Sequence, residues 1–205
     1  MSNYEAQYYM VDEVYNDETL YLKSTKNTGR RDYSFKKMNF GEEPLFFENA
    51  YKDEDLKRKV TRPIKTAHMN ITKVIVNDKI KKRLENFKVR NFQLFPSVII
   101  DDQEQYHEGY WFFNIYNKLE VLDFEKSEIR RYKPEREFHN VEKFALRADV
   151  LDKIPEEERL IFRINGLDRL LTFVHQKVVD IFEEEGVETL NFYKLSEYHS
   201  GQQFE

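Results

Sequence analysis

Two stretches decide the fold: TKVIVNDKIKKRLENFKVRNFQLF at residues 72–95 and LLTFVHQKVVDIFEEEGVETLNFY at residues 170–193. They follow the same course at an offset of 98 positions, and the paired residues are Val76 and Val174, Lys79 and Lys177, Ile80 and Val178, Leu84 and Phe182, Val89 and Val187, Phe92 and Leu190, and Leu94 and Phe192. In each stretch the apolar residues change from strand-like alternation to helical spacing and back. Each stretch is therefore predicted to be a strand-helix-strand unit. An internal duplication would explain the pairing, and so would the apolar pattern that any two such units share.

These units predict an α+β fold, a mixed sheet with few helices. Residues 4–50 are rich in Tyr and Phe with turn-forming residues between them, which is typical of short strands and loops. Residues 51–67 are charged and include Arg62-Pro63, so they are the best candidate boundary. We therefore expect an N-terminal subdomain at residues 1–66 and a core domain at residues 67–205, with one compact domain as the alternative.

Local signals place the ends of helices. Asp78 is predicted to cap a helix that runs to about Phe87, and Asp149 a short helix through Ile154. Gly186 is predicted to end the helix of the second unit.

Composition limits the class of protein. The 205 residues are 40% hydrophobic and 15% aromatic, enough for a sizeable core. No apolar run approaches the roughly 20 residues that cross a bilayer, and the first residues lack the pattern of a secretory signal. The absence of cysteine excludes disulfides, thiolate zinc sites and a cysteine nucleophile. A cytoplasmic protein is the expectation.

Charge is distributed unevenly, although the net charge is only -5. Residues 57–90 hold twelve Lys and Arg against Asp78 and Glu85. This basic segment could bind nucleic acid or an acidic protein, but a solvated helix face is favoured because no aromatic residues alternate with the cations. Conversely, the acidic runs 156–158 and 183–185 could receive a basic partner.

The search for catalytic, metal and cofactor motifs finds none. The five histidines are spaced too widely for a local metal-ligand pair, and they are His68, His107, His139, His175 and His199. No glycine-rich phosphate loop or GxSxG sequence is present. Residues 91–123 predict two strands joined by an acidic turn, whose carboxylates could serve acid-base chemistry or calcium but are favoured as a solvated loop.

The order of several short segments resembles the bacterial immunity proteins grouped as immunity protein family 11. The segments are Tyr8-Tyr9-Met10, Phe40-Gly41-Glu42 with Pro44-Leu45, Val74-Ile75-Val76, residues 91–96 with 110–115, Leu122-Asp123 with Lys126-Ser127, residues 160–163, and Gly186-Val187 with Leu190-Asn191-Phe192. The resemblance implies a non-enzymatic protein, without cofactor, that binds a toxin of a polymorphic, contact-dependent or type VI secretion system and protects the producing cell and its siblings.

The resemblance fixes no binding residues. From exposure and composition alone, we nominate the acidic turn as the partner-binding site, with Asp101, Asp102, Glu104, Tyr106 and His107. Two rival functions remain: a nucleic-acid-associated or regulatory module that uses the basic segment, and an enzyme. A pocket with His107 or His139 beside carboxylates would favour the enzyme.

Overall fold

Two mixed sheets form the framework of the computed structural model, which describes residues 3–31, 33, 35–116, 118–130, 135 and 137–202. The five-stranded sheet has the order β13 (Leu190–Lys194), β1 (Tyr8–Glu13), β12 (Thr172–His175), β11 (Ile161–Ile164) and β8 (Lys118–Leu119). The six-stranded sheet has the order β2 (Leu22–Ser24), β3 (Leu45–Asn49), β6 (Phe92–Ile100), β7 (Tyr106–Ile115), β5 (Lys73–Asn77) and β4 (Ala67–Asn70). A separate pair is formed by β9 (Glu128–Ile129) and β10 (Val141–Lys143).

Short helices connect these strands. The α-helices are α1 (Lys26–Gly29), α2 (Lys52–Arg58), α3 (Asp78–Leu84), α4 (Ala148–Leu151) and α5 (Gln176–Glu184), and the 3-10 helices are η1 (Tyr4–Ala6) and η2 (Glu156–Glu158). Within the described residues, no helix has the length and apolar character needed to span a membrane. The predicted α+β class, mixed sheets with few helices, is confirmed.

The two predicted strand-helix-strand units are also confirmed, as β5-α3-β6 and β12-α5-β13. In each unit the two strands flank a third strand that runs antiparallel to both, β7 in the first unit and β1 in the second. The registers agree: Phe112 of β7 faces both Ile75 and Phe95, and Met10 of β1 faces the equivalent residues of the second unit. This agreement supports the duplication, which stays a prediction.

The helix caps obey the same correspondence but correct the predicted positions. Asn77 caps α3 by accepting hydrogen bonds from two backbone N–H groups, and His175, 98 positions later, caps α5 through Nδ1. The prediction of Asp78 as the cap was therefore wrong by one residue, because Asn77 has the extended backbone that a cap requires and Asp78 is already helical. Helix α3 also ends at Leu84 rather than near Phe87.

The second short helix differs from its prediction as well. Helix α4 ends at Leu151 rather than Ile154, and its N-cap is Arg147, because Asp149 already lies within the helix. In contrast, the predicted end of α5 is confirmed: Gly186 has a φ of +64° just past the cap, where a left-handed residue suits glycine.

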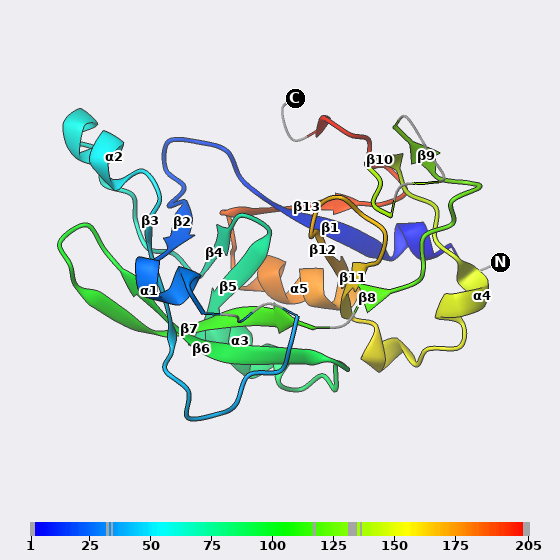
Figure 1. Ribbon diagram of the computed structural model, residues 1–205, viewed down its shortest axis with the longest axis horizontal. Coiled ribbons are helices and arrows are strands. Elements are labelled where there is room, and N and C mark those ends of the chain that lie inside the picture. Colours follow the sequence, from blue (N-terminus) through cyan, green and yellow to red (C-terminus); the bar gives the residue numbers. More distant parts are fainter. Residues whose placement is uncertain are drawn as a thin grey trace.

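One apolar core joins the units. Helices α3 and α5 contact each other and share this core with both sheets, and α5 lies at the centre of the molecule (Figure 1). The ring of Phe113 on β7 packs edge-on against Phe182 on α5, with centroids 6.2 Å apart, and both are almost completely buried. The helices thus fix the two sheets relative to each other.

The first 66 residues contribute to both sheets. Strand β1 is internal to the five-stranded sheet, whereas β2 and β3 extend the six-stranded sheet beside β6. The division at residue 66 stays a prediction, and these pairings favour its alternative, one compact domain. Helix α2 and the β6–β7 turn lie at one end of the molecule, far from β9, β10 and α4 (Figure 1).

Candidate functional site

The β6–β7 turn is held by one carboxylate. Asp101 Oδ1 accepts hydrogen bonds from the backbone N–H groups of Gln103 (2.9 Å) and Gln105 (2.8 Å), and Oδ2 lies 2.8 Å from Nε2 of His107. The hydrogen bond with His107, followed by the one from Gln105, lowers the pKa of Asp101 below its ordinary value. Asp101 thus stays ionised and gives the turn one fixed shape.

The other nominated residues lie around this turn. Asp102 accepts from the side-chain amide of Asn49 at 3.2 and 3.3 Å, so it is half-buried rather than free in solvent. Glu104 is exposed and lies 4.0 Å from Nζ of Lys52 on α2, and Tyr106 is 65% exposed. The structure places all five nominated residues at one hairpin end next to α2, with Asp101, Asp102 and Glu104 in the turn and Tyr106 and His107 at the start of β7. Their role in binding stays a prediction.

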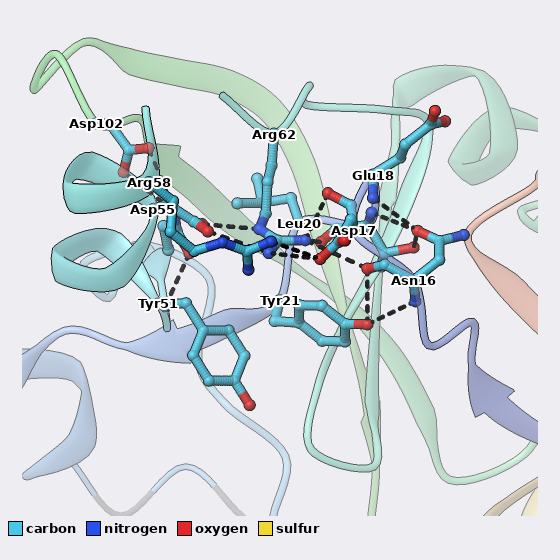
Figure 2. A network of polar contacts seen from close by, with 12 residues as sticks. Asn16, Asp17, Glu18, Leu20, Tyr21, Tyr51, Asp55, Arg58, Arg62 and Asp102 are labelled. Atoms are coloured by element: carbon cyan, nitrogen blue, oxygen red, sulfur yellow. Dashed lines mark hydrogen bonds and ion pairs between the residues drawn. The ribbon is translucent and has the colours of Figure 1, made fainter. Parts of the chain in front are cut away.

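Sequence reasoning missed the residue that organises this end of the molecule, Arg62 (Figure 2). Its Nε and Nη2 donate to the two carboxylate oxygens of Asp55 at 2.7 and 3.1 Å. Its Nη1 donates to the carbonyls of Asn16 (3.2 Å), Asp17 (2.8 Å) and Thr19 (3.1 Å). The side chains of Arg62 and Asp55 are only 5% and 1% exposed, so this is a buried, bidentate ion pair.

Asn49 connects the ion pair to the acidic turn. Its Nδ2 lies 2.9 Å from Asp55 and also reaches Asp102, while its Oδ1 accepts from the backbone of Tyr51 at the start of α2. The hydrogen bonds from Arg62 lower the pKa of Asp55 and the same contact raises the pKa of Arg62, so both remain charged. The network therefore joins the β1–β2 loop, α2 and the β6–β7 turn.

Two cavities share Arg62 as a wall. One, of about 360 Å³, lies between the acidic turn and residues 61–64, and its lining includes Asp101, Asp102 and His107. The other, of about 540 Å³, lies between the β1–β2 loop and α2, and its lining includes Tyr15, Tyr21 and Tyr51. These cavities make this end of the molecule the best candidate for a binding site.

The Asp101–His107 pair is the arrangement that sequence reasoning said would favour an enzyme. A carboxylate bonded to one ring nitrogen orients an imidazole and stabilises its protonated form, as a general base requires. In the described part of the chain, however, the ring of His107 has no hydrogen bond with a hydroxyl group that could act as a nucleophile. Among the same residues, no group of three or more His, Asp and Glu could hold a metal ion.

Two buried histidines, His68 and His175, have structural tasks. His68 accepts a hydrogen bond from the backbone of Lys65 at 2.8 Å, and burial lowers the pKa of His68 to about 4. His175 is the cap of α5, and burial likewise lowers its pKa. Both histidines are therefore neutral at pH 7.

Within the described residues, six of the twelve cations of the basic segment form ion pairs with carboxylates of the same chain. Arg83 on α3 bonds to Glu184 and Glu185 next to α5, Lys65 lies 3.1 Å from Glu188, and Arg90 lies 3.0 Å from Glu158. The remaining ion pairs of its cations are Arg58 with Asp17, Arg62 with Asp55 and Asp17, and Lys81 with Glu85. Both acidic runs that were candidates for a basic partner contribute to these pairs.

Comparison with known families identifies the family of the chain. The model of the Immunity protein family (Imm11) matches residues 10–197, nearly the whole chain. The chain belongs to this family. The predicted resemblance is thereby confirmed, and membership implies an immunity function with a toxin as partner. No curated protein matches the sequence of this Imm11 protein.

Proposed function

We propose that the protein binds one cognate secreted toxin and neutralises it in the cytoplasm of the producing cell and its siblings. The observation that carries this proposal is the family match over residues 10–197. In this proposal the toxin is the C-terminal domain of a larger protein encoded by a neighbouring gene and delivered by a contact-dependent or type VI system. Binding, and not catalysis, provides protection.

The proposed contact surface is the acidic turn with Asp101, Asp102, Glu104, Tyr106 and His107. Support comes from its rigidity, since Asp101 holds the turn from within and Asn49 ties it to α2. A surface that is ordered before binding loses less entropy in the complex. Its carboxylates suit a toxin with a basic active-site cleft, because complementary charge accelerates association and excludes related toxins.

The experiment is co-expression with the product of the neighbouring gene, with growth rescue and co-purification at moderate salt as readouts. Glu104→Lys and Tyr106→Ala change exposed side chains and should each weaken the complex about tenfold or more. Glu125→Lys is the matched control, since Glu125 is also exposed but lies in the loop before β9, at the opposite end of the molecule (Figure 1). Absence of both rescue and complex would refute the proposal, and equal effects of the three variants would refute the surface.

The Asp101–His107 pair supports a second candidate, an enzyme that modifies the toxin or its product. His107→Gln separates the two functions, because glutamine can hydrogen-bond to Asp101 but cannot act as a general base. Protection that survives in this variant excludes the enzyme. Protection that disappears while the complex still forms would establish it.

Nucleic-acid binding through the basic segment is the weaker alternative, because many of its cations are paired with carboxylates of the same chain. Binding to a random-sequence duplex that falls steeply with added salt would favour this alternative.

A further inference from the structure

Three tyrosines line the larger cavity beside Arg62. Tyr15 and Tyr51 are 52% and 48% exposed, and Tyr21 lies half-buried between them. The ring of Tyr21 stacks on Tyr15 with centroids 6.2 Å apart and meets Tyr51 edge-on at 5.4 Å. We call Tyr15, Tyr21 and Tyr51 the tyrosine cluster. Exposed, mutually packed tyrosines of this kind are favoured anchors in protein interfaces.

The cluster is held in place before any partner binds. Tyr21 Oη accepts a hydrogen bond from the backbone of Asn16 at 2.9 Å, and the guanidinium of Arg62 lies 5.5 Å from the centre of its ring. The backbone of Tyr51 donates to Asn49 at 2.9 Å. In Figure 2 Tyr21 and Tyr51 lie on the same side of the Arg62–Asp55 pair. The rings therefore lose little freedom on binding.

The lining of the cavity contains two guanidinium groups of the chain itself, which indicate the kind of ligand that fits there. Arg62 is one guanidinium against a tyrosine ring, and Arg58 is a second guanidinium in the lining, 3.5 Å from Asp17. Unlike Arg62, Arg58 is loosely held, because its side chain is 56% exposed and that of Asp17 is 77% exposed. Glu54, also in the lining, has no ion-pair partner in the described part of the chain.

We infer that this cavity receives an arginine side chain of the partner protein, which stacks on the tyrosine cluster, pairs with Glu54 and displaces Arg58 from Asp17. Arginine fits better than lysine because its planar, weakly hydrated guanidinium can stack on aromatic rings and can also form a bidentate pair with a carboxylate. The inference rests on the proposed function for the identity of the partner, a toxin. It adds an anchoring pocket next to the acidic turn, to which Asn49 already connects α2.

The test uses a defined probe, N-acetylarginine methylamide, titrated at low salt while the tyrosine ring signals are followed by NMR. The isosteric but uncharged citrulline derivative is the control ligand. We expect saturable shifts of the cluster signals with the arginine probe. The citrulline derivative should bind at least about threefold more weakly than the arginine probe, which is the effect of losing one exposed cation–π contact. Glu54→Gln should weaken arginine binding by a similar factor.

Arg58→Ala provides the sharpest variant because it removes the internal competitor. It should strengthen binding of the arginine probe by about two- to fivefold, whereas Glu125→Gln at the far end should change nothing. Equal shifts with arginine and citrulline, no saturable shift, or weaker binding by Arg58→Ala would each overturn the inference. These outcomes do not depend on growth rescue, so failure of this pocket and failure of the proposed function can be told apart.

Discussion

Replacing Arg62 with methionine should be the most damaging single change at this end of the molecule. Methionine keeps much of the apolar length of the side chain but removes all five of its hydrogen bonds. The carboxylate of Asp55, only 1% exposed, would then retain the amide of Asn49 as its side-chain partner. The carbonyls that Arg62 ties together would lose the same donor.

The magnitude follows from burial. Breaking a buried ion pair by removing one partner typically costs about 3–5 kcal/mol, because the other charge remains without compensation. This is a large share of the roughly 5–15 kcal/mol by which domains are stable. With a urea m-value of about 2–3 kcal/mol/M, the unfolding midpoint should fall by about 1–2.5 M.

Urea unfolding followed by circular dichroism measures this loss, and two further variants test its cause. Arg58→Met removes an exposed arginine of the same segment and should cost about 0.5 kcal/mol or less. Adding Asp55→Leu to Arg62→Met removes the orphaned charge and should recover part of the loss. A cost below about 1 kcal/mol for Arg62→Met, or no recovery in the double variant, would refute the reasoning.

Three more predictions concern the body of the fold. Burial raises the pKa of Glu13 to about 8 from its usual 4.5, so between these pH values the folded state retains a proton that the unfolded chain releases. The stability of the wild type should therefore decline as pH rises through this range. The stability of Glu13→Gln relative to the wild type should increase over the same range, as measured by urea unfolding at pH 5, 7 and 8.5. A constant difference across this range would contradict the assignment. Asn77→Ala removes the cap of α3 and should cost about 1 kcal/mol, whereas Asn77→Asp should cost much less. Because β1 and β3 tie the first 66 residues to both sheets, calorimetry should show one unfolding transition, and two separated transitions would instead support the subdomain boundary.

The elements could be predicted from the sequence where their signals are local. The change from alternating to helical spacing located α3 and α5 within their units, because side-chain periodicity reflects the face that each element buries. The order of the strands could not be predicted, since pairing depends on contacts between residues distant in sequence. Nothing in the local pattern of Tyr8–Glu13 indicates that it lies between β12 and β13.

The candidate site could likewise be predicted from the sequence only in part. The acidic turn could be nominated because turn-forming and charged residues mark a hairpin end. Arg62 was missed because a charged segment that precedes a proline is typical of a boundary between domains. Its partner Asp55 lies seven residues earlier on α2, and the chain leaves that helix at Lys59 in a left-handed conformation. Ion pairs that form across the end of a helix have no fixed spacing in the sequence. The role of Arg62 is therefore visible only in the structure, from the number of its polar partners.

Ion pairs between the two strand-helix-strand units explain part of the uneven charge distribution of the sequence. Arg83 of the first unit bonds to Glu184 and Glu185 of the second, so unlike charges favour the correct packing of two units whose apolar faces are similar. Apolar similarity alone would allow either unit to pack against another copy of itself, whereas like charges would then meet. Among the described residues, half of the cations of the basic segment are paired with carboxylates of the same chain, Arg62 with Asp55 among them. At the acidic turn and the tyrosine cluster, in contrast, Glu54 has no cationic partner among the described residues and Asp102 is paired with an amide, which supports the proposal that this end receives a basic partner.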